Sequence, residues 1–430
     1  MIKLTGDEEQ LLLQAQGSSS SLTAGEPITG EVEASTSTGV PEEPPPSFSL
    51  YDAEYFTDNS GNIVSHDPHL NSDGEALYRF LLSQSLSPPT IYIHCKATHQ
   101  ETRTRTVSSR HSDGRTHHHT ETYNETVTDF DFLLDISSLI LPLGGKEPIH
   151  WSSKDPEPSY RGRMFREIEG HTGKRRAIRA EKKVYAKWAK FRENAGIPPW
   201  VTESAESPYI DEHLASGALG SSKTVRQWAD DYCASPRLLK QFTYRKVVYG
   251  WNMDFALGRV HKTLTSAMGP FYGGNVQVFL EYHGNKIHIR PDNRLSRVLS
   301  NVWLKVLLWI LLIYPFIWLF KRFHSRGGGR WEVCGGAYPI TRYVPLESLQ
   351  SPPNEYRGKQ PDEPPPNYED TAASSSGLGD ARIKTTADGR QYVRQGVTEH
   401  TWFAKWERFI ISAVRQGHQS SIPIDGPRLT

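Results

Sequence analysis

Nineteen consecutive residues without an acidic side chain, VWLKVLLWILLIYPFIWLF (Val302–Phe320), constrain this chain more than any other feature. Thirteen of them are Leu, Ile, Val or Phe, each of which favours bilayer insertion by roughly 0.3 to 0.6 kcal/mol. As a helix the segment would span about 29 Å, close to the hydrocarbon thickness of a membrane. A buried core helix is the alternative, but the unbroken apolarity favours a membrane segment.

Aromatic and basic side chains indicate how this segment would sit in a bilayer. Trp303 and Trp318 lie near its ends, where an aromatic belt contacts headgroups. Lys305 is close enough to one end to extend its ammonium toward water. Lys321 and Arg322 follow the other end and would stop the segment at the interface. We therefore expect these five residues to contact the lipid bilayer.

Pro315 leaves two geometries open. A proline inside a helix removes a backbone hydrogen bond and kinks the chain. The segment is then either a kinked single pass or a re-entrant wedge with both ends on one side. The positive-inside rule does not choose, since four basic residues precede the segment and four follow it (Lys286, Arg290, Arg294 and Arg297; Lys321, Arg322, Arg326 and Arg330).

Composition bounds the location and the partners. The start of the chain, MIKLTGDEEQ, has no apolar core, so we expect no cleaved signal peptide and a cytosolic body at an endomembrane. Forty-nine basic and forty-nine acidic residues leave no net charge, which argues against a nucleic-acid partner. The three cysteines form no CxxC pair, which predicts neither a disulfide framework nor a zinc site.

A short proline motif follows the apolar segment. Pro365, Pro366 and Tyr368 form a PPNY sequence in a segment rich in Pro, Ser and charge. Polyproline II geometry suits the aromatic groove of a WW domain, and a second pocket there accepts the tyrosine. We expect these three residues to bind a WW-domain protein. A single pass would place a cytosolic body and this motif on opposite sides of the membrane, so the two inferences conflict.

The remaining sequence predicts an α+β protein with disordered segments. We expect a disordered arm over 1–48, an α+β domain over 49–300, an extended segment over 330–344, a disordered Pro-rich tail over 345–380 and an amphipathic helix over 397–415. Gly327–Gly329 would be a flexible hinge. If 330–344 pairs with the strands just before the apolar segment, both ends of that segment lie on one side and the wedge geometry is favoured.

A long hairpin over 91–136 is the clearest β signal. Its outer halves, IYIHC and FDFLLDI, are apolar and should enter a core, whereas the inner halves are polar on both faces and should project into solvent. Asp113-Gly114 marks the turn, and opposite charges on the two arms should help to fix the register. The run His117–His119 suggests a metal site, but adjacent strand residues point to opposite faces, so we favour a solvated ribbon.

Two amphipathic helices could reach a membrane surface. Lys174–Asn194 carries an apolar stripe with Trp188 among basic residues, and 397–415 carries Trp402 and Trp406 on one face. For both we favour packing of the apolar face on the body of the protein. Further helices are predicted at 74–84, 223–233 and 254–268, and strands at 241–251, 274–282 and 286–290, the last two around a tight turn at 283–285.

Nothing in the sequence specifies a reaction. The GxSxG, HExxH, GxxxxGK[ST] and GxGxxG patterns do not occur in a suitable setting. We expect a protein that is not an enzyme and that needs no cofactor and no metal.

Two resemblances accompany these features. Over about residues 47–345 the chain resembles a family of fungal single-anchor membrane proteins. The resemblance is carried, in this order along the chain, by SFSLYDAEYF, GNIVSHDPHLNSDGEALYRFLLSQ, IYIHCKATHQETRTRTV, TETYNETVTDFDF, RQWADDYC and KVVYGWN. That family has no established activity, so the resemblance implies membrane location alone. An anchor combined with Pro365, Pro366, Asn367 and Tyr368 is similar to membrane adaptors that recruit HECT-type ubiquitin ligases.

The sequence therefore predicts a membrane-anchored adaptor that recruits a WW-domain ubiquitin ligase. The alternative is a structural or lipid-surface membrane protein that recruits no ligase.

Overall fold

The computed structural model describes residues 52–110, 116–143, 147–170, 173–201, 221–346, 383–385 and 391–427. All of them belong to one unit, which begins at Asp52. The predicted arm over 1–48, the Asp113-Gly114 turn and the Pro365–Tyr368 motif lie outside the described residues. The α+β class is confirmed, since the described part combines helices with four sheets.

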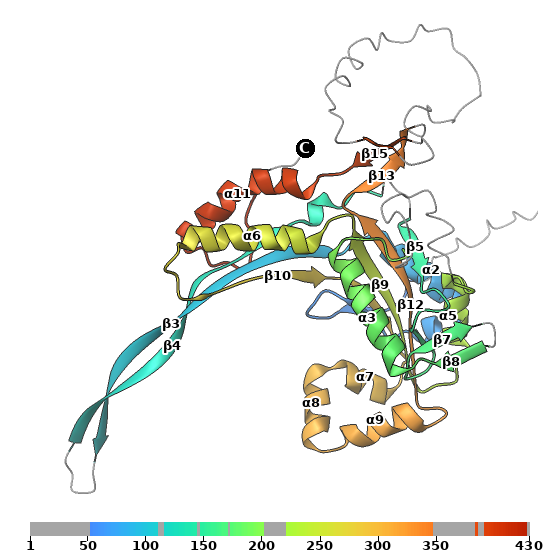
Figure 1. The fold of residues 1–430 in the computed structure, drawn as a ribbon. Helices are drawn as coiled ribbons and strands as arrows, with labels where there is room; N and C mark the ends of the chain where they lie inside the picture. Colours follow the sequence, from blue (N-terminus) through green and yellow to red (C-terminus); the bar gives the residue numbers. More distant parts are fainter. Residues whose placement is uncertain are drawn as a thin grey trace, which may run out of the picture. The chain divides into compact units, whose positions relative to one another are not determined.

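The largest sheet has seven strands, and β9 (Leu239–Tyr249) and β12 (Gly328–Pro339) lie at its centre (Figure 1). These two strands run parallel. The order is β1-β2-β11-β9-β12-β5, with β6 also on β12; the outer strands are β1 (Phe56–Thr57), β2 (Ile63–Ser65), β11 (Lys286–Ile289), β5 (Ile149–Ser152) and β6 (Tyr160–Arg161).

Three helices bury one face of this sheet: α1 (Pro68–Ser72), α2 (Gly74–Ser85) and α5 (Val225–Cys233). Alternation along β9 places Phe242 and Tyr244 in this core, against Trp228 and Tyr232 of α5. The Thr224 side chain begins α5 in a capping box with Gln227. The predicted helices at 74–84 and 223–233 are confirmed.

A second sheet carries the long hairpin and has the order β10-β3-β4. Its strands are β3 (Thr90–Arg110), β4 (Thr116–Asp135) and β10 (Asn275–His283), and the 3₁₀ helix η1 (Ser137–Leu139) follows β4. The predicted hairpin is confirmed: its apolar ends are buried, and the stretch beyond β10 is mostly exposed. Arg105 lies directly opposite Glu121, with 3.0 Å between Nη2 and Oε2.

Two helices, α6 (Met253–Met268) and α11 (Glu399–Arg415), cover this second sheet (Figure 1). Trp402, Trp406 and Ile410 of α11 are almost fully buried in its core. The prediction that the 397–415 helix packs on the body is therefore confirmed. Phe409 of the same helix is 41% exposed.

Two local predictions are wrong. Residues 174–176 do not begin a helix but belong to β8 (Gly173–Arg176), which pairs with β7 (Glu167–Gly170); α3 (Arg179–Asn194) starts afterwards. The strands around 283–285 exist, but they do not pair with each other. Instead β10 pairs with β3, and β11 pairs with β9 and β2. Gly284, with φ 67°, turns the chain from one sheet into the other.

Most of the predicted Pro-rich tail, residues 347–380, lies outside the described residues. The strand β13 (Arg342–Pro345) precedes this segment and β14 (Ile383–Thr385) follows it, and both strands pair with β15 (Gln391–Gln395). Neighbouring strands lie about 4.8 Å apart, so the two ends of this segment are held close together by β15.

The apolar segment predicted as a membrane helix over 302–320 is not one continuous helix. The structure has α7 (Arg294–Ser300), α8 (Val302–Ile310) and α9 (Tyr314–Phe323) in its place. Among the described residues, no helix alone has the length and apolarity of a membrane span; only α8 and α9 together have them, with a bend of 103° between them. Pro315 lies in the first turn of α9, where its missing N–H needs no partner.

Both ends of this bent pair return to the same end of the large sheet. The preceding strand ends at Ile289, opposite Phe242 of β9, and the following strand begins at Gly328, opposite Leu239. The predicted extended segment over 330–344 is thus confirmed, but its partner is β9, which separates it from β11. The insertion from Arg294 to Phe323 is called the wedge below. Its two connections to the sheet lie at the same end of the central strands.

Gly327 makes this return possible, and the predicted flexible hinge at Gly327–Gly329 is wrong. All three glycines are buried. A Cβ on Gly327 would lie 2.1 Å from the carbonyl oxygen of Phe320 in α9, and one on Gly329 would lie 2.6 Å from Cδ of Arg237. Only glycine lets the end of the wedge pack this closely on β12.

Gly327→Ala should lower the free energy of unfolding by about 1 to 3 kcal/mol, because the added methyl group overlaps a backbone carbonyl. Chemical denaturation of the purified chain measures the change. Gly258→Ala in α6 is the matched control, since a Cβ there meets nothing within 4 Å and the substitution should be neutral or stabilising. Equal stability of the two variants would contradict the packing described for Gly327.

Candidate membrane-attachment site

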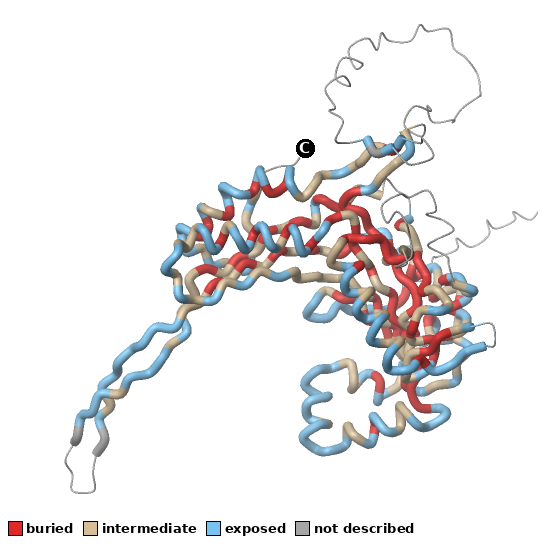
Figure 2. The backbone as a smooth tube through the Cα atoms, in the orientation of Figure 1, coloured by how far each residue is buried: buried red, intermediate tan, exposed pale blue. Residues whose placement is uncertain are grey.

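Most residues of α8 and α9 are exposed (Figure 2), large apolar ones included. Ile317 is the only buried residue of α8 and α9. The most exposed large apolar side chains are Trp303 (83%), Phe316 (72%), Phe323 (72%), Ile310 (71%), Val302 (68%) and Leu312 (68%). Large apolar side chains exposed along consecutive helices are typical of a surface that contacts a membrane or a partner.

Leu312 occupies a position that usually belongs to glycine. Its φ is 57°, and among the described residues it is the one non-glycine with a positive φ. The N–H of Leu312 donates to Trp309 O (3.1 Å) and that of Ile313 to Leu308 O (3.0 Å). These bonds form a Schellman motif that ends α8. A leucine in the left-handed region costs roughly 1–2 kcal/mol, so this bend keeps an apolar side chain at the expense of stability.

Aromatic and cationic side chains pair along the wedge. The Lys305 ammonium lies 5.7 Å from the ring centroid of Tyr314, and the Arg322 guanidinium lies 5.4 Å from that of Trp318. Trp309 stacks on Tyr314 at 4.8 Å. Lys305 is therefore near the α8–α9 bend rather than at a distant membrane boundary, because the bend brings the two helices together.

The sheet face opposite α5 is polar and positively charged below the wedge. His288 Nδ1 lies 3.1 Å from Nε2 of Gln241 and 3.2 Å from the Thr243 hydroxyl. Burial and, to a smaller extent, the nearby Arg290 together lower the pKa of His288 to about 4. Two carboxylates offset part of the positive charge. The charge of Asp58 raises the pKa of His288, and Glu332 forms an ion pair with Arg330.

Acidification should destabilise this face. His288 has a pKa of about 4 in the folded chain and about 6.5 when unfolded. Because the unfolded chain binds the proton more readily, the contribution is fully present above about pH 6.5 and is lost as the pH falls toward 4, by about 3 kcal/mol. Denaturation at pH 7 and pH 4.5 should show a smaller loss in His288→Gln than in the parent chain. An identical loss would exclude His288 as the cause.

The apolar stripe of α3 is only partly packed. Val184 is 61% exposed and Phe191 56%, whereas Tyr185 and Trp188 are half-buried. The expectation that the apolar face packs on the body is therefore confirmed only in part. Arg192, the one buried residue of α3, lies 3.7 Å from Glu157 and attaches the helix to the body.

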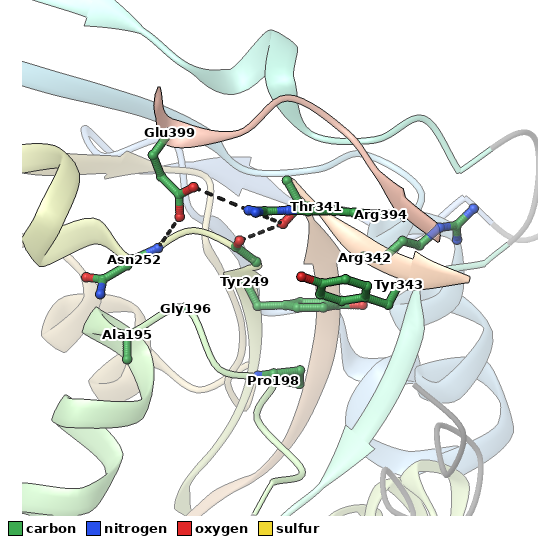
Figure 3. A pocket seen from close by; sticks show the side chains of 11 residues that line it. Ala195, Gly196, Pro198, Tyr249, Asn252, Thr341, Arg342, Tyr343, Arg394 and Glu399 are labelled. Carbon is green, nitrogen blue, oxygen red and sulfur yellow. Dashed lines mark hydrogen bonds and ion pairs between the residues drawn. The ribbon is translucent and has the colours of Figure 1, made fainter. Parts of the chain in front are cut away.

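A small cavity of about 190 Å³ lies where the Pro-rich segment joins the body (Figure 3). Its charged groups bond to one another. Arg394 Nη2 lies 3.3 Å from Glu399, which also accepts the backbone N–H of Asn252 at 2.8 Å. Thr341 donates to the carbonyl of Gly250 at 2.6 Å. These bonds hold β15 against the beginning of α11, so the cavity has a structural role.

A more open cavity of about 810 Å³ lies beside the hairpin. Its Asp129 carboxylate accepts a hydrogen bond from Tyr272 at 2.5 Å and contacts His99 Nδ1 at 2.9 Å. The carboxylate and the burial of Tyr272 raise the pKa of that hydroxyl. This chain of bonds attaches the loop after α6 to β4, and neither the sequence pattern nor the geometry adds a nucleophile to it.

The predicted site residues have separate outcomes. Trp303, Lys305, Pro315, Trp318, Lys321 and Arg322 all lie in the wedge. Pro365, Pro366 and Tyr368 lie outside the described residues. Within the described ranges, no group of three or more His, Cys, Asp or Glu residues could hold a metal ion. His119 bonds Glu121 at 3.0 Å on the exposed ribbon. Sequence reasoning missed Leu312, whose only signal is the Leu-Ile-Tyr-Pro run at a helix end.

Comparison with known proteins adds no family: no family model, no curated protein and no solved structure matches the chain significantly.

Proposed function

We propose that the protein is a membrane-attached interaction protein whose wedge enters one leaflet of a bilayer. The proposal rests on one observation: α8 and α9 are apolar and exposed, while the chain before and after the wedge joins the large sheet at the same end of β9. A chain that passed through the bilayer once would have to separate those two connections. The wedge geometry keeps the body on a single side of the membrane.

Length also favours partial insertion. α8 has nine residues and α9 has ten, so each is about 14 to 15 Å long, half of the roughly 30 Å hydrocarbon core. The bend of 103° shortens the reach of the pair further. Arg322, in the last turn of α9, can extend toward headgroups from the base of such a wedge.

Leu312→Asp should reduce membrane attachment about 10- to 100-fold. The bend is the part of the apolar segment most distant along the chain from both attachment points, and a carboxylate near a membrane interior costs roughly 2.5–3.5 kcal/mol at full depth. Aspartate tolerates the left-handed region better than leucine does, so the fold should persist. Flotation of the full chain with liposomes measures attachment.

Leu312→Asn and Leu312→Gly are the matched controls for that experiment. Both relieve the backbone strain, and neither introduces a charge, so we expect melting temperatures at or above that of the parent chain and attachment between those of the parent and Leu312→Asp. Unchanged flotation of Leu312→Asp with an intact melting curve would exclude the wedge as the anchor.

We further propose that the segment between β13 and β14 recruits a WW-domain protein, such as a ubiquitin ligase, through Pro365, Pro366 and Tyr368. The support is positional. Both ends of this segment are tied to the body by β15, and a wedge keeps the body on one side, which removes the conflict between a cytosolic body and an exported motif. No catalytic role and no cofactor is part of this proposal.

Tyr368→Ala should abolish capture of the full chain by an isolated WW domain, because the tyrosine pocket would be empty. Tyr356→Ala is the matched control and should bind like the parent, since that tyrosine belongs to no PPxY sequence. Capture of Tyr368→Ala at the parental level would contradict recruitment through this motif. It would favour the alternative of a lipid-surface protein, which the exposed Val184 and Phe191 of α3 support.

A further inference from the structure

A cavity of about 440 Å³ lies at the base of the wedge, between the first strand of the body and the α7–α8 junction. Its lining comes from two parts of the chain: Glu54, Tyr55, Phe56, His66 and Asp67 from the start of the body, and Arg297, Ser300 and Asn301 from α7 and the residue before α8. Asn301 is the residue immediately before α8 and accepts the N–H groups of Trp303 (3.0 Å) and Leu304 (3.4 Å). The cavity therefore lies where the apolar wedge meets the polar body.

The floor of the cavity is held by hydrogen bonds between the body and α7. His66 is 9% exposed, and its Nδ1 lies 3.0 Å from the carbonyl of Pro291. Its Nε2 lies 2.9 Å from the Ser300 hydroxyl, which also accepts from Arg290 at 2.7 Å. Burial and the adjacent Arg290 lower the pKa of His66, so the ring is neutral at pH 7. The floor thus joins the two parts of the lining in a fixed arrangement.

The two parts of the lining carry complementary chemistry. Tyr55 and Phe56 are 49% and 48% exposed, and Phe56 stacks on His66 with 6.2 Å between ring centroids. Together with the Glu54 carboxylate they offer aromatic faces and a negative charge. In the other part, Arg297 bonds Asp292 through Nε, and a guanidinium has four further N–H donors on its terminal nitrogens. The Asn301 amide supplies another N–H donor, since its oxygen is used by α8.

We propose that this cavity binds a phosphocholine group, the headgroup of a zwitterionic phospholipid. The quaternary ammonium would contact Tyr55, Phe56 and Glu54, because aromatic faces beside a carboxylate are the usual recognition site for such cations. The phosphate would bond Arg297 and Asn301. A cavity of this size falls in the range of roughly 300–1,000 Å³ that small-molecule sites occupy.

The position at the base of the wedge selects a lipid rather than a soluble ester as the source of the group. The inference rests on the proposed attachment of the wedge, since a lipid headgroup reaches this cavity when α8 is in a leaflet. It deepens that proposal by giving the protein a preference for choline lipids. A wedge alone, which contacts acyl chains, would bind choline and ethanolamine lipids alike.

Flotation of the full chain with two vesicle types tests the site. One type contains phosphatidylcholine and phosphatidylglycerol. The other contains phosphatidylethanolamine and the same fraction of phosphatidylglycerol, which keeps the ethanolamine lipid in a bilayer. We expect the parent chain to bind the choline vesicles about fivefold to tenfold more tightly. Tyr55→Ala/Phe56→Ala and the conservative Glu54→Gln should lose this preference while still binding the ethanolamine vesicles. Phe271→Ala, exposed by 99% and outside both wedge and cavity, should keep it.

Saturation-transfer NMR with soluble phosphocholine, on the chain in a maltoside detergent, identifies the source of the group. A weak signal that Glu54→Gln removes, together with the vesicle preference, supports the lipid site. Soluble binding without any vesicle preference overturns the lipid assignment, and equal binding of both vesicles by the parent overturns the inference. Neither result affects the wedge, whose failure would appear instead as normal flotation of Leu312→Asp.

Discussion

The parallel pairing of β9 and β12 is the constraint on which the remaining structure depends. A parallel neighbour requires a crossover connection, and here the chain between β11 and β12 contains the whole wedge. Because β11 runs antiparallel and β12 parallel to β9, β11 ends and β12 begins at the same end of β9, and the wedge starts and ends there. Gly327 then allows α9 to lie against the beginning of β12. The strand directions in the large sheet, rather than the apolar sequence of the wedge, therefore decide that both ends of the wedge lie at one end of β9.

This arrangement concentrates costly features at one end of the sheet. Leu312 is held in a strained conformation, and His288 is kept neutral beside Arg290. Large apolar side chains such as Trp303 are left to solvent. Such features persist when the rest of the fold compensates for them, and they cluster at functional positions. A leaflet would bury the apolar side chains, and headgroups would meet the basic sheet face, so one environment accounts for both observations.

Most helices and strands could be predicted from the sequence because the periodicity that indicates them lies within consecutive residues. The apolar ends of β3 and β4 alternate with period two, and the stripe of α11 repeats with helical spacing, so both segments could be assigned from neighbours in the chain. The predicted attraction between the two arms of the hairpin is likewise confirmed by the ion pair of Arg105 and Glu121. Failures occurred where a residue's role depends on distant partners. Gly327–Gly329 resembles a linker but packs against α9 and Arg237, and β10 and β11 look like a hairpin but join different sheets.

By itself, the sequence determined that exposing residues 302–320 to water is unfavourable. It also determined that the chain is α+β, since composition and periodicity are properties of consecutive residues. It also predicts a docking motif at Pro365, Pro366 and Tyr368, independently of any fold. Only the tertiary structure decided that the apolar segment bends back at Leu312, that both its ends meet β9, and that Tyr55 and Arg297 line one cavity. Residues separated by more than two hundred positions are brought together by sheet pairing, and no periodicity along the chain records that pairing.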